Sequence, residues 1–227
     1  AMTSVDALHQ SARYIPVDSS GRREAGTPPW DPDASYDPND NTVYVSEALL
    51  TPVFLDPRIT LAANYGRFGA IIGHEMVHAV DEFSAGVAPY ASLSSTLFAE
   101  PYAQMEALLE ASDLGTNKID TDGLSKMLLA DAIGLNIAQR AWQKRTASSE
   151  DGIRSQSQQT DAWANPFDEQ QRFFISWAQL WATPAQHSNT QQPMFRAEAL
   201  RATIPLRLMD SWYRAFDISQ GETIVLE

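Results

Sequence analysis

Two histidines and a glutamate near residue 75 have the types and spacing of a metal-dependent hydrolytic site. The segment reads His74-Glu75-Met76-Val77-His78, and residues four apart lie on the same face of an α-helix. Both imidazoles can therefore bind one metal ion at ~2.0–2.1 Å, the usual distance from Zn²⁺ to nitrogen. Glu75 would lie beside the ion, where its carboxylate can take a proton from an attacking water and pass it to a leaving nitrogen. The same pattern also occurs by chance in helices, with histidines that are ordinary surface or core residues.

Composition restricts the ligands and the partners. The chain has no cysteine, so a metal must be held by imidazole and carboxylate groups. Two imidazoles and a carboxylate suit Zn²⁺, although they also accept Fe²⁺, Co²⁺ or Mn²⁺. Sixteen lysines and arginines against 29 aspartates and glutamates give a net charge of −13. That charge repels phosphate backbones, so nucleic acid is not expected as a partner.

One long helix must position the histidines. It is predicted over residues 59–83, where His74, His78 and Asp81 recur at helical spacing. The other predicted elements are a strand over 42–46 and helices over 96–112, 124–142 and 168–181. These elements predict a mainly α domain with a small edge β-sheet, an α+β fold. Residues 1–29 are interpreted as an extended lead-in and 30–227 as one catalytic domain.

Asp131 stands out within the helix predicted over 124–142. It interrupts an apolar stripe formed by Leu124, Met127, Leu128, Leu135, Ala138 and Trp142. An ionised carboxylate that faces a core is costly unless a cation or a hydrogen-bond donor meets it. We therefore expect Asp131 to have a positive or hydrogen-bonding partner.

Several short motifs resemble one family. They are Asn64-Tyr65-Gly66, Ile71-Ile72-Gly73 before the histidine pair, Asp33-Ala34-Ser35-Tyr36, Ala130-Asp131, Gly134-Leu135, Phe173-Phe174 and Ala178-Gln179-Leu180-Trp181. Together they resemble the neprilysin-like zinc metallopeptidases over most of the chain, from about Trp30 onward. The resemblance implies a zincin or thermolysin-like catalytic domain that binds one Zn²⁺ ion and cleaves a peptide or small amide. It also implies that His74 and His78 bind the ion and that Glu75 is the general base.

The resemblance also assigns roles outside the histidine pair. Asp131 would orient a ligating histidine, and His187 would donate to the oxyanion of the reaction. Arg196 would bind a substrate carboxylate or carbonyl. Asp33 and Ala34 would lie on an edge strand that pairs with the substrate backbone, although the family has asparagine where this chain has Asp33.

Two departures from the family affect the site. The family's third ligand is a glutamate four residues before the aspartate, and Met127 stands there; a thioether is a poor Zn²⁺ ligand. Asp131 itself, a glutamate of the set Glu100, Glu106 and Glu110, or a second polypeptide would then complete the site. The family's large helical lid domain is also missing from this sequence, and a second polypeptide could supply it.

Two alternatives to an active peptidase follow. One is a catalytically degenerate pseudo-peptidase that acts as a binding or regulatory subunit of a heteromeric complex. The other is a metalloenzyme used for a different reaction. No apolar run reaches the ~18 residues of a membrane span, and no signal segment is recognised, so the sequence assigns no compartment.

Overall fold

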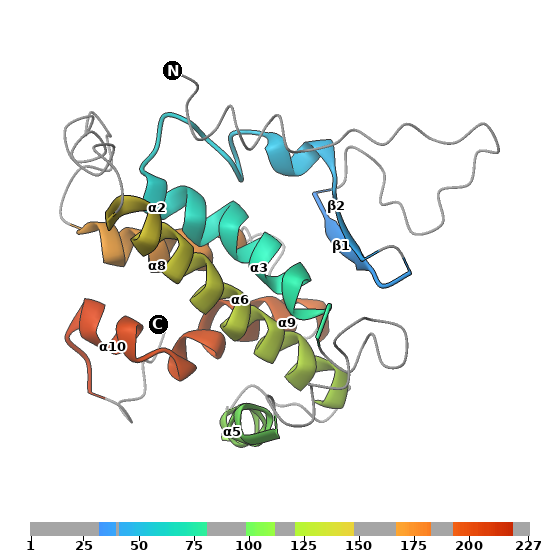
Figure 1. The fold of residues 1–227 in the computed structure, drawn as a ribbon. Helices are drawn as coiled ribbons and strands as arrows, with labels where there is room; N and C mark the ends of the chain where they lie inside the picture. The colour runs from blue at the N-terminus through green and yellow to red at the C-terminus, as the bar shows by residue number, and fades with distance from the viewer. Residues whose placement is uncertain are drawn as a thin grey trace.

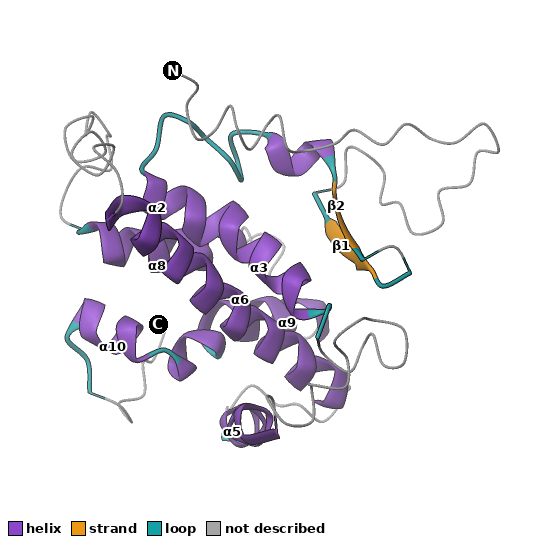
Figure 2. Ribbon diagram, in the orientation of Figure 1, coloured by secondary structure: helices purple, strands orange, loops and turns teal. Residues whose placement is uncertain are grey.

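The computed structural model describes residues 32–39, 41–80, 99–111, 121–147, 167–182 and 193–219. In chain order its elements are β1 (Ala34–Asp37), β2 (Thr42–Val45), the 3-10 helix η1 (Glu47–Leu50), α2 (Leu61–Asn64), the π-helical turn η2 (Tyr65–Gly69), α3 (Ala70–Val77), α5 (Ala99–Glu110), α6 (Thr121–Ala147), α8 (Glu169–Leu180), α9 (Pro193–Thr203), the 3-10 helix η6 (Pro205–Leu208) and α10 (Asp210–Phe216). Figure 1 shows their arrangement, and Figure 2 shows that helix dominates it. The expected mainly α fold with a small sheet is confirmed.

Helix α6 is the centre of the described structure. It runs beside α3 in the opposite direction, with α8, α9 and α5 packed around it (Figure 1). A Cβ atom at Gly134 would lie 2.5 Å from the backbone nitrogen of His74, and one at Gly73 would collide with the backbone of Gly134. The two helices therefore touch backbone to backbone, which only glycine permits at these positions.

The predicted long helix over 59–83 is present in altered form. Its described part begins at Leu61, where the Thr60 side chain accepts a hydrogen bond from the backbone N–H of Ala63 at 3.3 Å. Between α2 and α3 it passes through the π-helical turn η2. The regular helix ends at Val77, with His78 as the C-cap. Residues beyond 80 in this prediction lie outside the described part of the chain.

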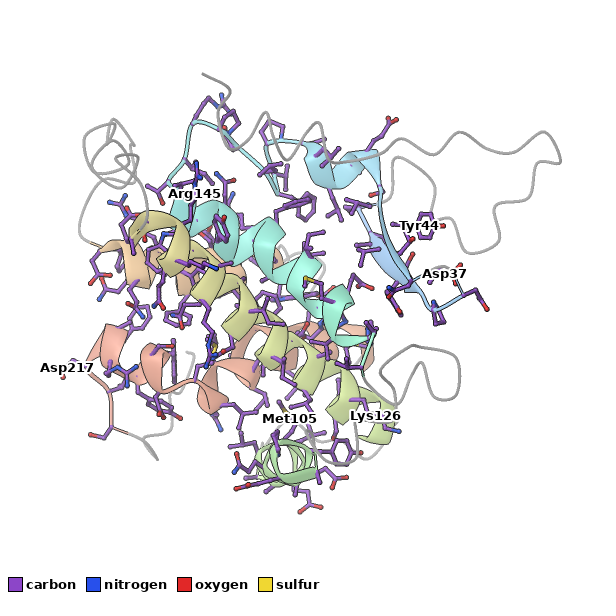
Figure 3. All side chains as sticks on the ribbon, viewed as in Figure 1. Asp37, Tyr44, Met105, Lys126, Arg145 and Asp217 are labelled. Atoms are coloured by element: carbon purple, nitrogen blue, oxygen red, sulfur yellow. The ribbon has the colours of Figure 1, made fainter. Side chains whose placement is uncertain are left out.

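Three apolar clusters fill the interior. The first joins α2, α3, α6, α8 and η6 through Ala62, Ala70, Leu135, Ala138, Trp142, Phe173, Phe174, Trp177, Leu206 and Met209. The second joins α5, α6 and α9 through Met105, Leu109, Leu124, Leu128, Leu129, Ala132, Leu200 and Ile204. Figure 3 shows Met105 on α5, between that helix and α6. The third lies between η2 and the hairpin and consists of Leu49, Leu55 and Phe68.

The sheet is a single antiparallel hairpin that lies against α3. Strand β1 pairs with β2 so that Ala34 faces Val45 and Asp37 faces Thr42. The strand predicted over 42–46 is confirmed as β2. Strand β1 has no counterpart among the elements predicted from periodicity, but it contains Ala34, which the resemblance placed on an edge strand.

The remaining helix predictions hold, with one exception in side-chain placement. Helices over 96–112, 124–142 and 168–181 correspond to α5, α6 and α8, and α6 extends further at both ends. Asp168 closes the start of α8 with a capping box, in which its side chain and that of Gln171 bond each other's backbone N–H groups. Met127 was expected within the buried stripe of α6, but it is 36% exposed. That expectation was wrong, because residue 127 does not join the apolar cluster that buries Leu124, Leu128 and Leu129.

The glycine contact between α3 and α6 can be tested by substitution. We expect Gly134→Ala to reduce the free energy of unfolding by about 2 kcal/mol, since the new methyl group meets backbone that cannot move aside. Gly69→Ala is the matched control, because its Cβ would meet the side chain of Tyr65 at 3.3 Å rather than backbone. Urea unfolding of both variants measures the difference. Equal stability of the two variants would contradict the close contact.

Candidate active site

His74 is held in one orientation by a buried carboxylate. Its Nδ1 lies 2.7 Å from Oδ1 of Asp131, across the interface between α3 and α6. Asp131 is 1% exposed, and a carboxylate accepts hydrogen bonds, so Nδ1 carries the proton. Nε2 of the neutral ring is then left with its lone pair. This is the tautomer and orientation that a metal-binding histidine needs.

His78 brings a second ring nitrogen to the same point. Its Nε2 lies 3.2 Å from Nε2 of His74, and the two rings are nearly perpendicular. Two nitrogens bound to one tetrahedral ion at ~2.0–2.1 Å are separated by about 3.3 Å. The observed separation therefore fits two imidazoles that share one metal ion. Within the described residues, the grouped candidate ligands are His74, Glu75 and His78, with ligand atoms within 4.8 Å of one another.

Glu75 lies buried beside the histidine pair, with 8% of its surface exposed. Burial raises the pKa of its carboxyl group above the ordinary value, because the charged form loses solvation. The two histidines and the backbone N–H of Tyr36 act in the opposite direction, and the charge of Asp33 adds to the increase. Strand β1 therefore reaches the glutamate directly, and the hairpin forms one wall of the site.

Asp131 has a second partner that the sequence did not reveal. Arg201, on α9, donates from Nε to Oδ2 and from Nη2 to Oδ1 of Asp131, each at 2.8 Å. The guanidinium carbon lies 3.9 Å from the ring centroid of Trp181. The indole N–H of Trp177 donates to the backbone carbonyl of Arg201 at 3.1 Å. The arginine is thus fixed at both its backbone and its side chain.

The charge of Asp131 is stabilised by these partners. Burial alone would raise its pKa, but the hydrogen bonds from Arg201 and His74 lower it below the ordinary value. Both oxygens are engaged by the two partners. This geometry suits an orienting role for Asp131 better than direct coordination of a metal. The expected positive partner is present, and it is Arg201.

The register of α3 and α6 is set by three observed pairs. Cβ atoms at residues 69 and 138 approach to 3.6 Å, and Gly73 meets Gly134, four residues further along each helix. His74 and Asp131 form the third pair. Continued by one helical turn, this register leads us to expect residue 127 opposite His78. The side chain at that position is the thioether of Met127.

The other expected site residues have different outcomes. Asp33 and Ala34 lie on the hairpin, where the N–H of Asp33 donates to Oγ of Ser46 at 3.1 Å. His187 lies outside the described residues. Arg196 falls on α9, and its side chain lies outside the described part. The three alternative ligands of α5, Glu100, Glu106 and Glu110, are exposed.

No signal available in the sequence pointed to Arg201. It lies on α9, after Arg196 on the same helix, but it belongs to none of the motifs that resemble the family. The unpaired carboxylate expected at Asp131 was the one clue that a cation must exist. Only the fold identifies which of the 16 lysines and arginines it is.

Comparison with known proteins identifies the wider group. The sequence profile of Peptidase family M13 matches residues 33–227. A neutral endopeptidase of Lactobacillus helveticus is 25% identical over 201 residues, which are 86% of this chain and 28% of that protein. Neprilysin-1 of Caenorhabditis elegans is 29% identical over 162 residues, 65% of this chain and 20% of that protein. The chain thus spans less than a third of the length of these curated relatives.

A solved structure has a similar fold. A zinc metalloprotease of Mycobacterium tuberculosis, crystallised with an inhibitor, superposes with a TM-score of 0.67 and is 25% identical, covering 91% of this chain and 33% of that one. Within the part of the chain that the structure describes, no helix is long and apolar enough to cross a membrane.

Loss of Arg201 should leave a buried charge without its cation. We expect Arg201→Gln to reduce the free energy of unfolding by about 3 kcal/mol. Arg201→Lys should fall between this variant and the native protein, because lysine keeps the charge but loses the two-pronged contact. Arg140→Gln is the control, since Arg140 is exposed and has no ion pair or hydrogen bond recorded in the described structure, so its loss should change little. Identical urea midpoints for native protein and Arg201→Gln would contradict the buried pair.

Proposed function

Because this chain belongs to Peptidase family M13, we propose that it forms the catalytic domain of a zinc-dependent metallopeptidase that cleaves a peptide or small amide bond. The observation that carries the proposal is the pair of imidazoles whose Nε2 atoms lie 3.2 Å apart beside the buried Glu75. The chain spans only part of its relatives' length. The activity of the whole protein is therefore part of the proposal.

Each residue of the histidine pair and its neighbours has a separate proposed role in amide hydrolysis. His74 and His78 would hold one zinc ion, with Asp131 and Arg201 keeping the first ring in place. When bound, the ion supplies Lewis acidity, which activates water and polarises the scissile carbonyl. Glu75 accepts the proton from the attacking water and delivers it to the leaving nitrogen. Glu75 lies next to the first histidine in the sequence and is buried beside the pair, which places it within reach of such a water.

Substrate binding is proposed for residues on two sides of this centre. Asp33 and Ala34 begin the hairpin strand whose Tyr36 amide reaches Glu75, so a peptide aligned along that strand would pass close to the base. His187 is proposed to donate to the developing oxyanion, and Arg196 to bind a substrate carboxylate or carbonyl. These two roles rest on their positions in the sequence.

Met127 favours a second candidate function. The grouped candidate ligands are two imidazoles and the carboxylate of Glu75. Because Glu75 is the proposed base and both oxygens of Asp131 are engaged, the proposed site has only two histidine ligands among the described residues. A site with two protein ligands binds zinc weakly, so the same fold could serve as a pseudo-peptidase that binds peptides without cleaving them. A second polypeptide that supplies the missing ligand and a lid is a further proposal. Co-purification of a stoichiometric partner that restores zinc binding would support it.

Zinc content tests the primary proposal. Protein purified without chelator should contain about one equivalent of zinc by elemental analysis. His78→Ala should lose it, because one imidazole cannot retain the ion. Glu75→Gln should keep the zinc while any hydrolysis of a peptide library falls at least about 100-fold, the usual contribution of a general base. Metal-free native protein with an intact fold would instead favour the pseudo-peptidase.

Restoring the family's ligand tests the role of position 127. We expect Met127→Glu to bind zinc at least about 10-fold more tightly than the native chain, since a carboxylate opposite His78 completes a three-ligand site. Met76→Glu is the matched control, because Met76 is also an exposed methionine, 51% exposed, but it lies on α3 between the two histidines. Competition with a chromogenic chelator measures both affinities. Equal affinities in the two variants would show that residue 127 does not reach the ion.

A further inference from the structure

A hollow in the protein surface lies away from the histidine pair. It has a volume of about 450 Å³ and is bordered by α6, α8, η6 and α10. None of its lining residues belongs to α3 or to the hairpin. Its volume falls within the range of small-molecule sites, which is roughly 300–1,000 Å³.

The inner wall of the hollow carries a buried amide that lacks an acceptor. Gln139 is 4% exposed, and its Oε1 accepts a hydrogen bond from Oγ of Ser211 at 2.8 Å. Its Nε2 has no hydrogen-bond partner within the described residues. Buried amide N–H groups are normally paired, because leaving one unpaired loses the hydrogen bonds it made to water. Because less than 1 Å² of that atom is exposed, the amide belongs to the packed wall of the hollow and is not a contact for a bound molecule.

Two arginines from different helices border the same hollow. Arg140 lies on α6 and Arg214 on α10, and both are exposed. Neither has an ion pair or a hydrogen bond recorded anywhere in the described structure. The one carboxylate in the lining, Asp210, has another interaction of its own. Two unpaired guanidinium groups are notable in a chain with a net charge of −13.

The rest of the lining fits a small organic molecule. Amide side chains of Asn136, Gln143 and Gln170 add hydrogen-bonding groups around the arginines. Leu208, Met209 and Ala215 supply an apolar part that a short hydrocarbon chain can contact. The hollow thus combines two guanidinium groups, neutral amides and a limited apolar surface.

We propose that this hollow binds a small dicarboxylate. Each carboxylate pairs with one guanidinium group through two parallel hydrogen bonds. The site is separate from the proposed zinc centre and does not depend on it. Inorganic phosphate shares the oxyanion chemistry and serves as the comparison ligand.

Calorimetric titration of zinc-free protein with succinate tests the proposal, at constant ionic strength and against chloride. We expect one equivalent of succinate to bind, and the Arg140→Gln/Arg214→Gln double variant to bind at least about tenfold more weakly. Arg58→Gln, which removes an exposed charge outside the lining, and His78→Ala, which disables the proposed zinc site, should bind succinate as the native protein does.

Several outcomes would overturn the proposal. They are the absence of saturable succinate binding, undiminished binding by the double variant, and loss of binding in His78→Ala. Phosphate binding as tight as that of succinate would replace the dicarboxylate with a simple oxyanion. If the double variant does not fold, protection of Arg140 and Arg214 from phenylglyoxal by succinate, read by mass spectrometry, provides the same decision on the native chain.

Discussion

The fully buried carboxylate of Asp131 connects three helices at one point. It sits on α6, binds His74 on α3 at 2.7 Å and is gripped by Arg201 of α9 at 2.8 Å. A charge in this position is tolerated only while both partners remain, because its desolvation must be offset by charge-assisted hydrogen bonds. The carboxylate of Asp131 therefore both holds α3, α6 and α9 together and fixes the orientation of the His74 ring.

The glycine pair makes this connection short enough to form. With side chains at residues 73 and 134, α3 and α6 would separate, and the distance from His74 to Asp131 would increase. The same closeness fixes the register of α3 against α6, from which residue 127 is expected opposite His78. The helix contact and the candidate site therefore depend on the same register.

Much of the fold and of the site was predictable from sequence, for identifiable reasons. The histidine spacing, the long apolar helices and the isolated Asp131 are local or periodic signals that do not require knowledge of distant contacts. Arg201 was not predictable, because its partner lies 70 residues away and nothing in its neighbourhood distinguishes it. The exposure of Met127 was also missed, since periodicity along α6 cannot reveal where α3 ends. The lining of the hollow beside Gln139 comes from four elements, and no local sequence pattern indicates that these elements meet.

The π-helical turn at Tyr65–Gly69 has a consequence for how this helix tolerates change. Each residue of an α-helix advances the chain by about 100° around the axis, so one added residue before the histidines rotates everything after it by that amount. The turn separates two helical segments whose side chains contact different parts of the protein: Asn64 accepts a hydrogen bond from the backbone N–H of Asp56 on the loop before α2, and His74 faces Asp131 on α6. The turn therefore sets the rotation of one segment about the helix axis relative to the other. A single-residue deletion within 65–69 would leave both segments helical but would rotate the histidines away from Asp131. Insertions and deletions in this turn are therefore limited by the rotation they cause, not by the change in helix length.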